Sequence, residues 1–249
     1  MEKTLLLIVD PQNDFVDPRG SLFVQDSPKA IEYICKFIDT KNPTEIIVSQ
    51  DSHQYYNIGF PKFWNIPGLK AFDKIRVEDI VSQKVKPVYI KPDNYRDFYR
   101  QFEDFSINDE LTIWPYHCIE GSWGWCFPEA LVESLGKWSL KNKKTYQIYR
   151  KGFIPELEAY SIFPKIDMMG NVEIESPKIQ EHTYSNIYIS GFCKDICVAE
   201  SVKYIWHYNK NIDNLVFLDN CMSTLDKNSP NLDVYNYMLE VDRAKIENV

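Results

Sequence analysis

The sequence predicts an α/β fold of the doubly wound type, with a mostly parallel central sheet and helices on both of its faces. Five short runs are rich in apolar and β-branched residues, which is typical of strands. Two of them, Thr4–Val9 and Glu45–Ser49, show no alternation with polar residues, as expected of central strands buried on both faces. Helical patterns separate most of the runs, so the strands can be connected in parallel.

The predicted elements follow one another along the chain with few interruptions. The strands are Thr4–Val9, Glu45–Ser49, Thr145–Tyr149, Ile187–Gly191 and Asn214–Leu218. Helices are predicted where apolar residues recur every three or four positions, and Pro28 and Pro128 open two of them, where proline is favoured. The helices are Ser27–Asp39, Pro128–Leu140, Ala199–Tyr208 and Leu232–Ile246. The polar sequence of segment 164–185 predicts a loop or a short hairpin.

The chain of 249 residues is expected to form one domain, residues 1–249, with an insertion at about 54–113. The insertion lacks strand and helix alternation and is rich in aromatic, proline and charged residues, although Val85 to Ile90 predicts a strand. A long irregular segment inside a domain is typical of a lid or a binding loop. The alternative is a surface loop without a role in the site.

The composition excludes several classes of partner. The formal charge is −8, with 28 basic residues spread among 36 acidic ones, which argues against binding to nucleic acid or to an anionic membrane. The apolar run Thr4–Val9 is too short for a signal sequence. Six cysteines are too sparse for a disulfide scaffold, so a reducing compartment is expected: the cytoplasm, with the nucleus as a second location. A second copy of the same chain, in a homo-oligomer, is the alternative to a monomer.

Four reactive side chains stand just beyond the carboxyl ends of separate predicted strands: Asp10, Asp51, Lys151 and Cys197. In an open parallel sheet this edge is where ligands bind, so the four residues are expected to converge. Cys197 lies where a helix begins, a place that stabilises a thiolate, and it is the candidate nucleophile. Taken one at a time, each residue also suits a structural role, such as a buried cysteine or a turn-forming aspartate.

A metal site is also expected at this edge. Asp51 and His53 supply a carboxylate and an imidazole from one turn, a pairing suited to a divalent metal such as zinc. His117 would complete a set of three ligands and leave positions open for water or substrate. The alternative is that these residues are ordinary loop residues, since two ligands do not make a site.

Five motifs carry a resemblance to a known family. They are Val9-Asp-Pro-Gln-Asn-Asp-Phe15, Asp51-Ser-His53, Trp114-Pro-Tyr-His-Cys118, Lys151-Gly-Phe153 and Gly191-Phe-Cys-Lys-Asp-Ile-Cys-Val198. In this order they resemble the nicotinamidase branch of the isochorismatase-like cysteine hydrolases, over nearly the whole chain. The resemblance implies an amidohydrolase that converts nicotinamide to nicotinate and ammonia through a cysteine thioester, in NAD salvage.

The resemblance also implies roles for individual residues. It implies a catalytic triad of Asp10, Lys151 and Cys197. It implies that one divalent ion, zinc or else Fe²⁺ or Mn²⁺, is held by Asp51, His53 and His117. Glu158 matches a position next to the water shell of the metal, and the positions that line the substrate pocket are matched by Phe15, Trp114 and Tyr160. A cis peptide bond before Cys193 is implied, with the backbone N–H groups of Cys193 and Cys197 facing a developing oxyanion.

Some residues depart from the family pattern. Cys193 and Ile196 replace the more usual small residue and tyrosine before the nucleophile, and Trp123 and Trp125 crowd a neighbouring turn. These changes leave substrate specificity open. The closest rival function is a related hydrolase acting on a pyrazinamide-like or carbamoyl amide or on isochorismate. Rivals from another class are a thiol redox protein that uses Cys193 and Cys197, and a non-catalytic zinc-binding module.

Overall fold

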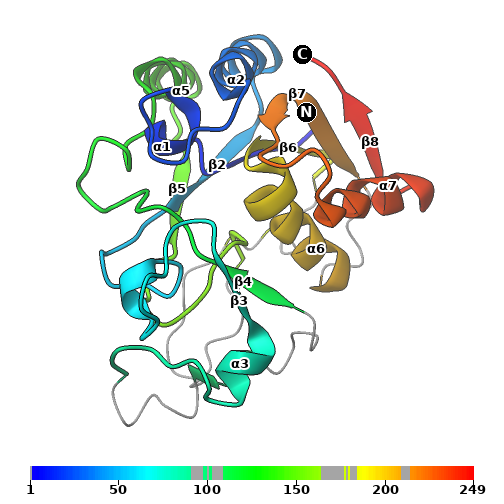
Figure 1. Cartoon of the computed structure of the whole chain (residues 1–249). Coiled ribbons are helices and arrows are strands. Elements are labelled where there is room, and N and C mark those ends of the chain that lie inside the picture. Colours follow the sequence, from blue (N-terminus) through cyan, green and yellow to red (C-terminus); the bar gives the residue numbers. More distant parts are fainter. Residues whose placement is uncertain are drawn as a thin grey trace.

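The computed structural model describes residues 2–90, 98–99, 101–102, 109–163, 177, 179, 184–208 and 214–249 (Figure 1). A six-stranded sheet in the order β5-β2-β1-β6-β7-β8 lies at its centre, and all of its neighbouring strands are parallel. The strands are β1 (Thr4–Val9), β2 (Glu45–Asp51), β5 (Gln147–Lys151), β6 (Asn186–Phe192), β7 (Leu215–Ser223) and β8 (Ala244–Glu247). The prediction of a parallel central sheet is confirmed.

Helices cover both faces of this sheet. On one face α2 (Ser27–Lys41) and α5 (Glu129–Asn142) lie side by side, and on the other lie α6 (Ala199–Tyr208) and α7 (Asp233–Glu240) (Figure 1). Three short helical segments complete this part of the chain: α1 (Asn13–Val16), a π turn (Lys194–Val198) and a 3₁₀ turn (Pro230–Leu232). The doubly wound architecture is therefore confirmed.

The central strand β1 explains why its sequence shows no alternation. Successive side chains of a strand point to opposite faces. Leu6 and Ile8 enter the apolar core beneath α2 and α5, whereas Leu5, Leu7 and Val9 enter the core beneath α6 and α7. Every one of these side chains is fully buried. A strand with helices on both sides must be apolar at each position.

The insertion folds around an apolar cluster of its own. It contains β3 (Lys74–Arg76), antiparallel to β4 (Glu110–Thr112), with α3 (Val77–Val81) and a 3₁₀ turn (Pro61–Phe63). Its buried residues include Ile58, Phe63, Trp64, Ile75, Leu111 and Ile113. These elements lie together beyond the carboxyl edge of the main sheet (Figure 1).

The prediction of a strand at Val85 to Ile90 is wrong. Residues 85–90 form no strand, and the one β-type pair in this stretch joins Pro87 to Trp64. Proline has no N–H to donate to a sheet. Val88 and Tyr89 are 61% and 59% exposed, so their β-favouring side chains have no apolar surface against which to pack.

The end of the chain also differs from its prediction. The helix expected over Leu232 to Ile246 stops at Glu240, and Ala244–Glu247 forms β8 instead. Asp242 has a left-handed backbone conformation, with φ of 57°, which turns the chain back toward the sheet. Segment 164–185, predicted as a loop or hairpin, lies mostly outside the described residues. Among the residues that the structure describes, no helix is long and apolar enough to cross a bilayer.

Candidate active site

The structure brings the four sheet-edge residues together. Asp10 directly follows β1, Asp51 ends β2 and Lys151 ends β5, and these three strands are neighbours in the sheet. Asp51 and Lys151 are also opposite each other in the β2–β5 register. Cys197 comes from the π turn that follows β6, on the other side of β1. The parallel topology thus places an acid, a lysine and a thiol at one point.

Lys151 lies at the centre of this group and is almost completely buried. Its Nζ donates to Asp51 Oδ1 at 3.1 Å, to the Ala159 carbonyl at 3.0 Å and to Cys197 Sγ at 3.6 Å. A further carboxylate oxygen, Asp10 Oδ2, lies 2.9 Å from Nζ. Burial lowers the pKa of Lys151, but the carboxylates of Asp10 and Asp51 raise it well above its usual value. Lys151 is therefore a fixed positive charge beside the thiol.

Asp10 has one carboxylate oxygen bonded and one open. Oδ1 accepts a hydrogen bond of 2.6 Å from the Ser49 hydroxyl, while the Ser49 oxygen accepts the Asp10 backbone N–H at 2.9 Å. Oδ2 lies 2.9 Å from Lys151 Nζ, but it is fully buried and receives no hydrogen bond of acceptable geometry. Burial raises the pKa of Asp10 more than the charge of Lys151 lowers it. An open lone pair and a raised pKa are properties of a general base.

The position of Cys197 differs in detail from the sequence prediction. A place at the start of a helix was expected, whereas Cys197 is the fourth residue of the π turn that precedes α6 and is buried. Burial raises the pKa of Cys197 well above its usual value, although Lys151 acts to lower it. A raised pKa favours the thiol form, so a neighbouring base would help to produce the thiolate.

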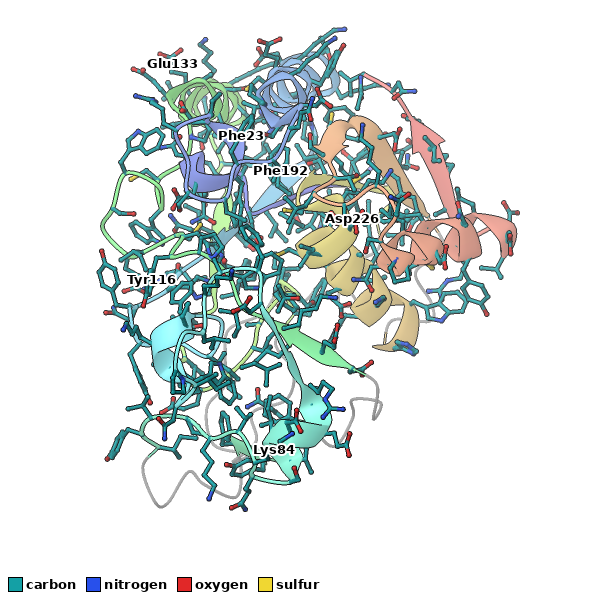
Figure 2. The ribbon with its side chains drawn as sticks, in the orientation of Figure 1. Phe23, Lys84, Tyr116, Glu133, Phe192 and Asp226 are labelled. Atoms are coloured by element: carbon teal, nitrogen blue, oxygen red, sulfur yellow. The ribbon has the colours of Figure 1, made fainter. Side chains whose placement is uncertain are left out.

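Cys193 lies at the start of the same turn. It is buried and lines the same pocket as Cys197. The peptide bond between Phe192 and Cys193 is cis, as the resemblance implies. Phe192 itself is fully buried and lies in the interior of the molecule (Figure 2).

The three expected metal ligands form a compact cluster next to the triad. Asp51, His53 and His117 each offer one ligand atom, and these atoms lie within 4.8 Å of one another. Asp51 Oδ2 is 2.8 Å from His53 Nε2 and 3.3 Å from His117 Nε2, while Oδ1 of the same carboxylate faces Lys151. Burial raises the pKa of Asp51, but the charges of His53 and Lys151 together lower it by more, so that it lies well below its usual value. Asp51 is therefore an ionised carboxylate shared by both groups.

The orientation of the two imidazoles fits a divalent metal. His53 Nδ1 lies 3.0 Å from the Gly152 carbonyl, and His117 Nδ1 lies 2.8 Å from the Pro115 carbonyl. A carbonyl can only accept, so each Nδ1 carries a proton and each Nε2 is left to face Asp51. In neutral imidazoles those Nε2 atoms present lone pairs, which converge with a carboxylate oxygen. This donor set, with Nδ1 held by a carbonyl, is the arrangement found around zinc.

A pocket opens onto both groups. Its empty space is about 520 Å³, including solvent at its mouth. The residues matched by resemblance all line it, namely Phe15, Trp114, Glu158 and Tyr160. Trp114 Nε1 donates to the Tyr160 hydroxyl at 3.0 Å. This bond joins the end of the insertion to the loop that follows Lys151.

Several residues of the site were missed in the sequence. The apolar walls of the pocket also include Leu22, Ile58, Phe60 and Leu157, which come from loops and from the insertion. No periodic pattern marks such loop residues. Ser49 could have been found from the sequence. It precedes Asp51 by two positions, so both side chains leave β2 on the same face. Gln12 holds the backbone of Asp51, accepting from its N–H at 2.7 Å and donating to its carbonyl at 2.7 Å.

Comparisons of sequence support the resemblance. No family model matches the chain. A nicotinamidase of Saccharomyces cerevisiae is 26% identical over 193 residues, which cover 78% of this chain and 76% of the relative. A nicotinamidase of Schizosaccharomyces pombe is 23% identical over 207 residues, covering 82% and 76%.

Comparisons of structure give the same fold over the full length. An Acinetobacter baumanii protein described as a nicotinamidase and pyrazinamidase has a TM-score of 0.66 at 20% identity, covering 99% of this chain and 97% of its own. The yeast nicotinamidase Pnc1p with the inhibitor nicotinaldehyde has a TM-score of 0.66 at 19% identity, covering 99% and 100%. A pyrazinamidase of Pyrococcus horikoshii in complex with zinc has a TM-score of 0.57 at 17% identity, covering 99% of both chains. The resemblance to nicotinamidases is confirmed in sequence and in fold.

Proposed function

We propose that the chain is a metal-dependent amidase that hydrolyses nicotinamide to nicotinate and ammonia in NAD salvage. The observation that carries this proposal is the opening of one pocket onto Cys197, Lys151 and the cluster of Asp51, His53 and His117, with the buried base Asp10 next to Lys151. The sequence similarity to two nicotinamidases supports the choice of substrate. The inhibitor nicotinaldehyde, bound to a relative of the same fold, is likewise a small pyridine.

The first half of the reaction forms a thioester. Asp10 takes the thiol proton through its open oxygen Oδ2, and Lys151 stabilises the thiolate from 3.6 Å. Cys197 Sγ attacks the amide carbon, and the backbone N–H groups of Cys193 and Cys197 hold the oxyanion. Asp10 returns its proton to the amide nitrogen, the C–N bond breaks, and ammonia leaves.

The second half returns the enzyme to its resting state. A water molecule gives a proton to Asp10 and attacks the thioester carbon. The C–S bond then breaks, Asp10 passes the proton to the sulfur, and the carboxylic acid is released. The raised pKa of Asp10 suits it to carry the proton in both halves.

The divalent ion is assigned to Asp51, His53 and His117, with zinc as the proposed metal and Fe²⁺ or Mn²⁺ as alternatives. One carboxylate and two imidazoles are a donor set that these borderline metals share. When bound, the ion supplies a Lewis acid with open positions next to the substrate pocket, suited to a ring nitrogen. Glu158 lines the pocket beside this cluster and is assigned to its water shell.

Ser49→Ala is expected to lower kcat about tenfold with little change in KM, because Asp10 loses the hydrogen bond that fixes its carboxylate. It is also expected to lower the free energy of unfolding by about 1–3 kcal/mol, since a buried acceptor is left unsatisfied. Steady-state kinetics and urea unfolding measure the two effects. A variant with unchanged kcat would show that Asp10 does not depend on Ser49.

The purified protein is expected to release ammonia from nicotinamide, and exhaustive chelation is expected to reduce that rate at least tenfold. Zinc added back should restore it, and elemental analysis should find about one divalent ion per chain. Pyrazinamide, a carbamoyl amide and isochorismate are the comparison substrates. Hydrolysis of one of them but not of nicotinamide would assign the chain to the rival hydrolases, and full activity after chelation would remove the metal from the proposal.

A further inference from the structure

Gly152 connects the triad to the metal cluster. It follows Lys151 and has a left-handed backbone conformation, with φ of +74°. Its carbonyl oxygen lies 3.0 Å from His53 Nδ1 and accepts a second hydrogen bond of 3.1 Å from Asn57 Nδ2. One peptide group thus follows the catalytic lysine and orients an imidazole of the cluster.

The missing side chain of Gly152 matters as much as its carbonyl. A Cβ atom at this position would lie 2.6 Å from His53 Cε1 and 2.7 Å from Asp51 Oδ1. Both distances are well inside van der Waals contact, so both groups, or the backbone of residue 152, would have to move. Asp51 has little freedom to do so, because its Oδ1 is bonded to Lys151 and its backbone is held on both sides by Gln12.

Asn57 fixes the direction of the Gly152 carbonyl. Its side chain is 2% exposed, and while Nδ2 donates to Gly152, Oδ1 accepts the Gly59 backbone N–H at 3.0 Å. With both ends of the amide bonded, the carbonyl is held where His53 Nδ1 meets it. The proton of His53 therefore stays on Nδ1, and Nε2 stays directed at Asp51.

We propose that Gly152 is a positioning residue for the metal centre, acting through its carbonyl on His53 and through its lack of a Cβ on both His53 and Asp51. This inference rests on the proposed metal site. Groups that orient a metal ligand from outside the coordination sphere typically change metal affinity by about 10- to 100-fold. Gly152 is expected to lie in that range.

The test measures zinc affinity of the whole chain by competition with a chromophoric chelator. Gly152→Ala is expected to weaken zinc binding at least tenfold. Gly68→Ala is the matched control, because Gly68 has nearly the same φ, +78°, but a Cβ there would have nothing within 4 Å. The control carries the same backbone penalty and should bind zinc like the wild type. The rise in Tm on adding a fixed concentration of zinc should be smaller in Gly152→Ala than in the wild type and unchanged in Gly68→Ala.

Asn57→Ser provides a second test of the role of the Gly152 carbonyl if Gly152→Ala fails to fold. It removes the Nδ2 donor without adding bulk next to the metal ligands, and it should weaken zinc binding by a smaller factor than Gly152→Ala. Equal zinc affinity in the wild type and the folded variants would overturn this inference and leave the amidase proposal standing. A wild type that binds no zinc would overturn the inference together with the metal assignment, while ammonia release from nicotinamide tests the amidase proposal separately.

Discussion

Cys197→Ala is expected to lower kcat for nicotinamide by about 10⁴-fold or more, because it removes the sulfur assigned to form the thioester. The fold and the zinc content should stay those of the wild type. The Cys197 sulfur accepts a hydrogen bond from Lys151 and is assigned no part in holding the metal, and the substitution removes one buried sulfur atom. Ammonia release, circular dichroism and elemental analysis measure the three properties.

Cys193→Ala is the matched control for this prediction. Cys193 is buried, lines the same pocket and stands four residues earlier, but its assigned contribution is a backbone N–H that alanine keeps. It should retain most of the activity. The opposite pattern, with activity lost in Cys193→Ala and kept in Cys197→Ala, would contradict the assignment and favour a thiol redox protein.

The inner strands β1, β2 and β6 could be predicted because they are buried on both faces. Burial on both faces forces apolar residues at successive positions, and that pattern is readable in β1 and β2 without any knowledge of their neighbours. The edge strand β8 could not be predicted in this way. Two of its four residues, Lys245 and Ile246, are exposed, so its sequence carries no strand pattern and continues the helical one before it. Its state is decided by pairing with β7, a contact distant in sequence.

Part of the candidate site could likewise be predicted from the sequence, and part of it could not. Asp10, Asp51, Lys151 and Cys197 could be grouped from sequence, because parallel strands bring their carboxyl ends to one edge. The burial of Cys197 could not be predicted, since it depends on the depth at which the π turn lies, and this burial raises the pKa of Cys197 more than the charge of Lys151 lowers it. Contacts made by backbone atoms, such as that of the Gly152 carbonyl with His53, do not depend on the side chain, so the sequence shows only a glycine at this position.

Lys151→Ala is expected to lower kcat by about 10²- to 10⁴-fold with a modest change in KM. Its charge matters most when the thiolate forms, because Lys151 is the cation that opposes the effect of burial on the Cys197 pKa. That pKa should therefore rise further, which slower alkylation of Cys197 by iodoacetamide would reveal. The loss also leaves the buried carboxylates of Asp10 and Asp51 without their lysine, so stability should fall by about 3–5 kcal/mol.

Lys203→Ala is the control for a lysine outside the site. Lys203 pairs with Glu200 at 2.7 Å on α6 and does not line the pocket, so both kinetic constants should stay unchanged. His117→Ala is the contrasting variant inside the site. It removes an assigned metal ligand and leaves every contact of Lys151 in place, so metal retention should fall and KM should rise, with a smaller effect on kcat.

Nicotinamide and benzamide separate these two effects, since they differ in the ring nitrogen and share the amide. The wild type should prefer nicotinamide, and Lys151→Ala should keep that preference at a lower rate, because the lysine acts on the thiol common to both reactions. His117→Ala should reduce the preference, because the ring nitrogen loses the ion assigned to orient it. Equal hydrolysis of both amides by the wild type, with a ratio unaltered in His117→Ala, would remove the metal from substrate recognition and favour a related hydrolase of the same fold.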